Sequence, residues 1–138
     1  MEEKEKKPIK NFRDLEVYNE SYDASIEVIK NIVPKLPKEE KDDLCDQMRR
    51  SSKAIPRLIA EGYAKRHQNK GFQKFLDDAN GESNEMTVNL CHAKDLYSDH
   101  IDIELCEDLL DVYDMTSRKL YKLRKAWSNS KEKDTDEK

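Results

Sequence analysis

Residues 49–66 read RRSSKAIPRLIAEGYAKR. Within this stretch Ile55, Ile59 and Tyr63 recur every four residues, a spacing that places side chains on one face of an α-helix. Pro56 interrupts the pattern, because proline removes one backbone hydrogen bond of a helix and crowds the preceding turn. We therefore predict a helix that bends at Pro56.

The apolar and small side chains around Pro56 cover a wide arc of this helix when residues are placed about 100° apart. Ala54 and Leu58 lie along one edge of the arc, and Ile55 and Ile59 lie along the other. One edge is enough to face the interior of a bundle, which would leave Ala54 and Leu58 at the surface of a single chain. We predict that the helix also contacts a second subunit, through Ala54, Ile55, Leu58 and Ile59. The alternative is a broad core helix with a tolerated proline.

Basic residues form a stripe on the opposite side of the same helix, and more basic residues follow at its end. These candidate polyanion-binding residues are Arg49, Arg50, Lys53, Arg57, Lys65 and Arg66. Two interpretations stay open. The stripe can lie against an acidic neighbour, since residues 75–114 contain many carboxylates and only one lysine or arginine, or it can bind RNA, DNA or a protein partner. The formal net charge of −4 weighs against strong binding of nucleic acid.

Periodic apolar residues predict helices in the rest of the chain as well. Helices are predicted at about 12–33, 38–66, 72–96 and 102–127, the first of them ended by Pro34 and Pro37. Four helices of similar length with short connections predict an all-α, antiparallel, up-down-up-down four-helix bundle.

Composition sets the limits of this domain. Residues 1–11 and 128–138 are rich in charge and have almost nothing to bury, so we predict disordered tails on either side of a bundle domain at 12–127. The chain contains no apolar run long enough to cross a bilayer and no secretory signal. We therefore expect a cytoplasmic protein without a membrane partner.

Motifs that carry chemistry are missing from the sequence. The three cysteines have no CxxC spacing, which predicts reduced thiols, and no glutamate is followed by histidine at the i+3 spacing of a di-iron bundle. Neither of the glycine-rich phosphate-binding motifs is present. We predict no catalytic residues, metal or cofactor, and a protein that is not an enzyme.

Several segments together resemble a known family. They are FRDLEVY (12–18), LPKEEKDDLCDQMRRSS (36–52), AIPRLIAEGYAKR (54–66), FQKFLDDANGESNEM (72–86) and LCHAKDL (90–96). In order and spacing they resemble the four-helix-bundle protein family. That family includes the proteins encoded by intervening sequences in bacterial 23S rRNA genes and is similar to the accessory variability protein of diversity-generating retroelements.

The resemblance implies an antiparallel four-helix bundle that assembles as a homopentamer. The retroelement relatives bind nucleic acid and a reverse transcriptase through basic surfaces. Leu58 and Ala54 depart from the asparagine and serine usual in the family, and the acidic pI departs from the strongly basic retroelement members. We expect a non-enzymatic homo-oligomeric scaffold that binds RNA or a protein through its basic stripe. The alternative is a nucleic-acid-binding accessory factor linked to ribosomal RNA or a reverse transcriptase.

Overall fold

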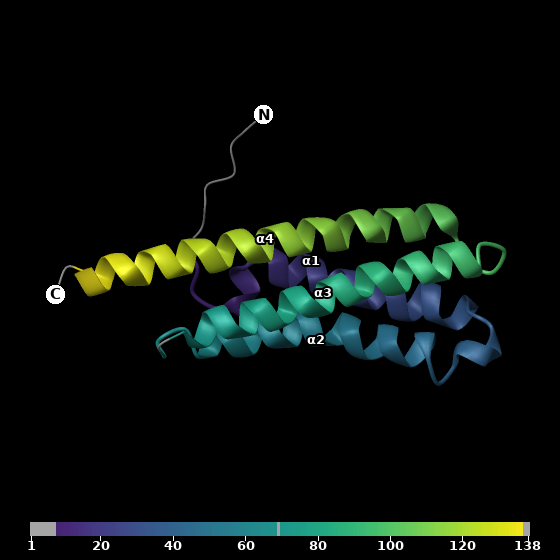
Figure 1. Cartoon of the computed structure of the whole chain (residues 1–138), viewed down its shortest axis with the longest axis horizontal. Coiled ribbons are helices and arrows are strands. Elements are labelled where there is room, and N and C mark those ends of the chain that lie inside the picture. The colour runs from purple at the N-terminus through teal and green to yellow at the C-terminus, as the bar shows by residue number, and fades with distance from the viewer. Residues whose placement is uncertain (1–7, 69, 137–138) are drawn as a thin grey trace, which may run out of the picture.

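The computed structural model describes residues 8–68 and 70–136, with side chains described as far as Trp127. This part of the chain is all-helical and contains four α-helices and no strand (Figure 1). The helices are α1 (Glu16–Glu27), α2 (Leu44–Ala64), α3 (Gly71–Leu96) and α4 (Ile103–Asp136). The all-α class and the four helices predicted from apolar periodicity are confirmed.

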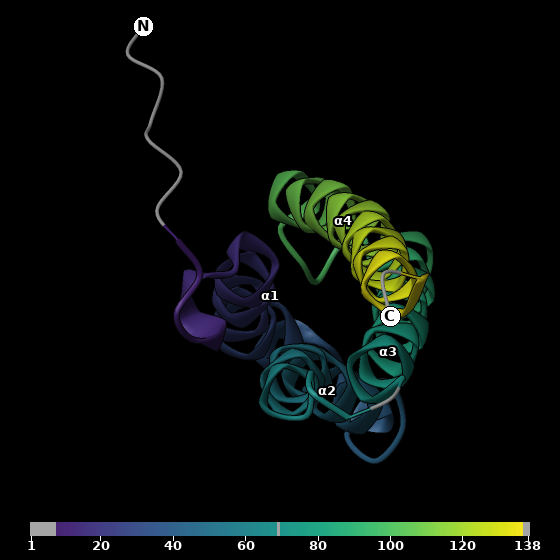
Figure 2. The ribbon, with the colours of Figure 1, turned by 90° about the vertical axis from the view of Figure 1, so that its left-hand side faces the viewer.

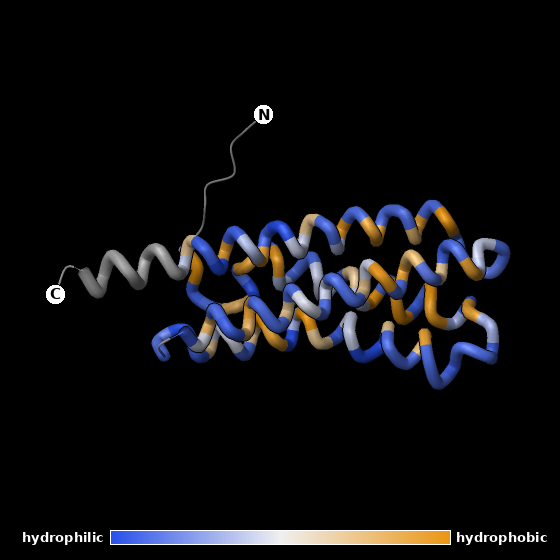
Figure 3. Tube along the Cα trace, in the orientation of Figure 1, coloured by the Kyte–Doolittle hydropathy of each residue, from blue (hydrophilic) through white to orange (hydrophobic). Residues whose placement is uncertain are grey.

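The four helices surround one shared core. Figure 2, which looks along the bundle, shows them as a ring in which α2 lies between α1 and α3. Helix α4 completes the ring by packing closely on α3 and more loosely on α1. Hydrophobic positions recur along each helix between hydrophilic ones (Figure 3). The largest fully buried side chains include Phe72, Met48, Ile55, Leu90 and Tyr113.

The first predicted helix, at 12–33, is divided in the structure. It begins as a short 3-10 turn, η1 (Phe12–Asp14), whose Asn11 side chain accepts a hydrogen bond from the Arg13 amide at 2.8 Å. After α1 the chain continues as a π-helical turn, η2 (Val28–Ile32), and a 3-10 turn, η3 (Val33–Lys35). The apolar spacing is kept through these turns, which is why the sequence pattern reads as one helix.

The predicted start of the second helix, near Lys38, is wrong. Lys38–Glu40 form a separate 3-10 turn, η4, and α2 begins at Leu44. Asp43 has φ −123° and ψ −96°, outside the helical region, so η4 and α2 are not continuous. Pro56 lies within α2, where it is buried and the helix runs through it to Ala64.

Helix α3 is continuous across polar residues in its middle. The fully buried Ser83 donates a hydrogen bond to the Tyr113 carbonyl of α4 at 3.0 Å, and Ser117 donates to the Ser83 hydroxyl at 2.8 Å. A buried hydroxyl is tolerated when it is hydrogen-bonded. The predicted helix at 72–96 is therefore confirmed despite its polar centre.

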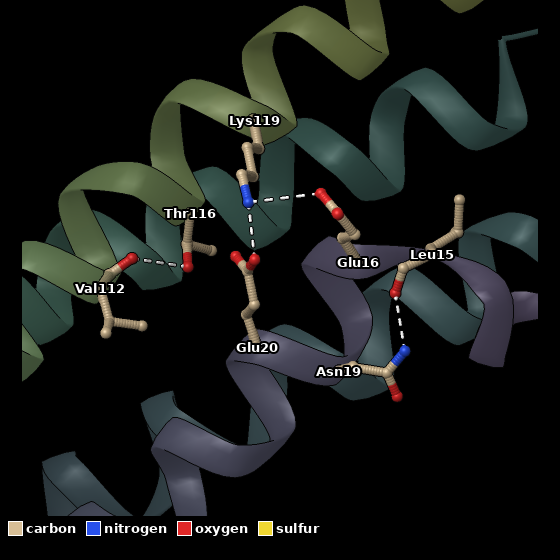
Figure 4. Close-up of polar contacts among 7 residues, drawn as sticks. All are labelled: Leu15, Glu16, Asn19, Glu20, Val112, Thr116 and Lys119. Carbon is tan, nitrogen blue, oxygen red and sulfur yellow. Dashed lines mark hydrogen bonds and ion pairs between the residues drawn. The ribbon is translucent and has the colours of Figure 1, made fainter. Parts of the chain in front are cut away.

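One lysine joins the two helices that pack most loosely. The Lys119 ammonium of α4 lies 2.6 Å from a carboxylate oxygen of Glu20 and 3.5 Å from one of Glu16, both on α1 (Figure 4). The hydrogen bond with Glu20 raises the pKa of Lys119, which further favours the charged form of the lysine.

The ends of the described chain bear on the predicted tails. Helix α4 extends beyond the predicted boundary at 127, as far as Asp136. Most of the predicted N-terminal tail, 1–7, lies outside the described residues, as do 137–138. No helix of the described part of the chain combines the length and apolarity needed to cross a bilayer.

Candidate interaction surfaces

The basic stripe lies on the outer face of α2. Arg49, Arg50, Lys53 and Arg57 are all exposed. Arg50 pairs with Asp46 of the same helix at 3.2 Å, an exposed pair of the kind that contributes less than about 1 kcal/mol. Within the described part of the chain, the other three form no ion pair.

Lys65 and Arg66 differ from the stripe because aromatic rings hold them. The Lys65 ammonium lies 4.9 Å from the centre of the Phe75 ring, and the Arg66 guanidinium lies 4.1 Å from the centre of the Tyr63 ring. Arg66 also donates a hydrogen bond to the Tyr63 carbonyl at 2.9 Å. These contacts place both cations at the carboxyl end of α2, where the helix dipole favours positive charge.

The structure places the predicted subunit-contact residues mostly inside the single chain. Ile55 and Ile59 are fully buried, Ala54 is only 5% exposed, and Leu58 is half-buried against the core. The premise that Ala54 would stay at the surface is therefore wrong. Because α2 lies between α1 and α3, its two neighbours cover a wider arc than one bundle face requires.

A groove of about 800 Å³ is lined by residues of α2 and α3. Its lining combines charged and polar residues with Ala54 and with Val88, which is 54% exposed. The charged and polar residues are Gln47, Arg50, Ser51 and Arg57 on α2, and Glu82, Asn84, Glu85 and Asn89 on α3. No pattern in the sequence predicts this groove, because residues from separate helices line it and no motif connects them.

Two carboxylates meet a serine in this groove. The Ser51 hydroxyl lies 3.1 Å from a carboxylate oxygen of Glu85, and Glu82 lies beside the same serine. Partial burial raises the pKa of Glu82, and the charge of Glu85 raises it further, while the proximity of Ser51 and the charge of Arg57 oppose the shift. The groove therefore disfavours the ionised form of Glu82 relative to its protonated form.

Replacing Glu82 by glutamine is expected to stabilise the fold near neutral pH. A carboxyl whose pKa is raised on folding favours the folded state below its unfolded pKa, and this contribution is lost as pH rises through the folded pKa. Urea unfolding should therefore show a larger gain for Glu82→Gln near neutral pH than at about pH 4. Glu104→Gln, at an exposed position of α4, is the matched control. An equal gain in stability for Glu82→Gln at both pH values would contradict a raised pKa of Glu82.

The described residues contain no cluster of histidine, cysteine and carboxylate side chains able to hold a metal ion. Cys45 and Cys106 are buried and Cys91 is exposed, and all three are free thiols.

Comparison with known proteins connects this fold to a family. A search of curated proteins found no match to the chain. The family model described as "23S rRNA-intervening sequence protein" matches residues 13–122, a range that runs from the turn before α1 into α4. The match covers most of the chain and includes all of α2, with its basic stripe and with the residues that line the groove beside α3. The chain therefore belongs to the 23S rRNA-intervening sequence protein family.

Proposed function

We propose that this protein is a non-enzymatic cytoplasmic scaffold that binds RNA through the basic stripe of α2. The observation that carries the proposal is the exposure of Arg49, Lys53 and Arg57 without an ion-pair partner among the described residues. Unpaired exposed cations can meet phosphates without first breaking an internal pair. Each contact with a phosphate releases condensed counterions, which favours binding.

The spacing of these three residues supports the proposal. They lie four residues apart on one helix, so their Cα atoms follow one another at about 6 Å. This is a row of positive charge on a rigid element, and a nucleic-acid backbone is a row of negative charge. The family description names 23S rRNA, which makes a structured RNA the first ligand to test.

The variant Arg49→Gln/Lys53→Gln/Arg57→Gln is expected to weaken RNA binding by at least about tenfold near 50 mM salt. The slope of log affinity against log salt should become shallower by roughly two to three, because each of the three lost phosphate contacts removes about 0.7 to 0.9 from it. Electrophoretic mobility shift with a structured RNA at about 50 and 200 mM salt measures both quantities.

The matched control removes the same charge elsewhere. Lys30, Lys35 and Lys38 are exposed and lie outside α2, in the turns η2, η3 and η4. Replacing these three by glutamine should leave binding near the wild-type level. Equal weakening by both triple variants, or no binding by the wild type at low salt, would contradict the proposal.

We further propose that the scaffold is a homo-oligomer, a homopentamer by the family resemblance, built from antiparallel bundles with a bend at Pro56. The short connections from α2 to α3 and from α3 to α4 support the antiparallel order of these helices. Ile55 and Ile59 are buried in the core of the single chain and are not available to a second subunit. The proposed subunit contact on α2 therefore consists of Leu58 and of Ala54, which lines the groove. The exposed Val88 on the opposite wall completes it.

Val88→Glu is expected to dissociate the assembly while keeping the helical content of the chain. The reason is that a charged carboxylate beside Glu82 and Glu85 would lose its hydration when a second copy covers the groove. Light scattering at micromolar concentration measures the mass, and circular dichroism measures the helicity. Tyr121→Glu, at a similarly exposed position on α4, is the control and should not change the mass. A monomeric wild type would contradict this proposal.

A further inference from the structure

A second groove, of about 560 Å³, runs between α1 and α4. Its floor is apolar. Ala24 and Leu109 are each only 4% exposed, and Leu105 and Val112 are half-buried. Met115 is 52% exposed at one side. An apolar lining at the loosest helix contact of the bundle is a surface that a partner can cover.

Carboxylates from both helices surround this floor, and no lysine or arginine lines the groove. They are Glu20, Asp23 and Glu27 on α1, and Asp108 and Asp111 on α4. Near one end, Glu20 is held by Lys119, which also reaches Glu16 (Figure 4). The remaining carboxylates give the groove a strongly negative rim.

We propose that this groove binds a basic amphipathic α-helix presented by another protein. Apolar side chains of such a helix would cover the floor, and its lysines and arginines would meet the carboxylates. The lining of α4 from Leu105 to Met115 spans about 15 Å, which matches about three helical turns with anchors at i, i+3 or i+4, and i+7. The negative rim repels nucleic acid and anionic lipid, which disfavours both as occupants.

The described surface of this chain offers free cations, but no helix face on which several large apolar residues lie beside them. On α4, Arg118 pairs with Asp114 and Arg124 pairs with Asp77, while Lys119 is held by α1. Lys122 and Lys125 are exposed without an ion pair among the described residues, but Tyr121 is the one large apolar residue exposed beside them. The stripe of α2 has free cations, but the exposed apolar residue beside it on the helix is the small Ala64. A partner with both large apolar residues and free cations therefore fits the groove better than a second copy does.

Fluorescence anisotropy with a labelled synthetic peptide tests the proposal. The peptide is a helix of leucine and lysine with leucines at i, i+3 or i+4, and i+7. The variant Asp23→Asn/Asp108→Asn, which neutralises one carboxylate on each wall, should weaken binding by at least about fivefold. Met115→Gln should weaken peptide binding by a similar factor, because part of the apolar lining of the groove is lost.

Matched variants and peptides make the result specific. Asp42→Asn/Asp99→Asn removes the same charge at exposed positions outside the groove, and Leu96→Gln removes an exposed apolar residue of α3. Both should bind the peptide as the wild type does. A peptide of the same composition with its leucines dispersed around the helix should bind at least about fivefold more weakly.

Two results would overturn the proposal. One is equal weakening by the groove variants and their controls, which would mean that the peptide senses only net charge. The other is a lower assembly mass for Asp23→Asn/Asp108→Asn than for the wild type in light scattering, since this result would identify a second copy as the occupant. RNA binding by the α2 stripe is measured separately and does not depend on either outcome.

Discussion

Replacing Ile59 by alanine should lower the free energy of unfolding by about 2 to 5 kcal/mol, the range for deleting a large buried aliphatic side chain. Ile59 is fully buried and belongs to the core that α2 shares with the rest of the bundle. The loss combines the apolar surface no longer removed from water with the cavity that the surrounding side chains fill only in part. Urea denaturation measures the loss directly.

The same experiment separates a core role for Ile59 from a role in a subunit interface. The contribution of a core residue belongs to one chain, so the loss should be the same at low and high protein concentration. The contribution of an interface residue falls on dilution, because association stabilises the folded state by mass action. Lys53→Ala, at an exposed site of the same helix, should change stability by no more than about 0.5 kcal/mol. A loss for Ile59→Ala that disappears on dilution would restore the interface assignment.

Replacing Gly62 by alanine is expected to destabilise the fold by about 1 to 3 kcal/mol, although alanine is the better helix former. A Cβ atom at this position would lie 2.6 Å from the Cβ of Phe75 and 3.0 Å from the ring of Phe72. Because the Phe75 Cβ is attached to the backbone, relief requires α2 and α3 to move apart. The cost of that movement should exceed the gain of about 1 kcal/mol in helix propensity.

Gly81 provides the matched control within α3. A Cβ atom there would meet nothing within 4 Å, and the residue is exposed. Gly81→Ala should therefore stabilise the fold by about 0.8 to 1 kcal/mol through helix propensity alone. Thermal unfolding should show a lower Tm for Gly62→Ala and a higher one for Gly81→Ala. A rise in Tm for both would show that α2 and α3 do not approach closely at Gly62.

The glycine pair illustrates what a sequence pattern contains and what it lacks. Gly62 and Gly81 both lie in predicted helices, and nothing in the flanking residues of either says whether another helix passes nearby. Their expected effects differ in sign because Phe75 lies against the first and open space lies beside the second. Long-range packing decides that difference.

The candidate surfaces follow the same division. The exposure of Arg49, Lys53 and Arg57 was predictable, because their spacing opposes the apolar positions of α2 on one helix. The groove between α1 and α4 was not, since the acids on its two walls are separated by most of the chain. Residues that share a groove across helices carry no common spacing in the sequence.

The sequence by itself determined that the chain forms four helices and that Ile55 and Ile59 share one helix face, because a periodicity of about 3.6 residues is a local property of each segment. Only the tertiary structure decided that Ala54 is covered, that α2 begins at Leu44, and that acidic walls face each other across α1 and α4. The physical reason is that the width of a buried face depends on how many neighbours a helix has and how closely they approach.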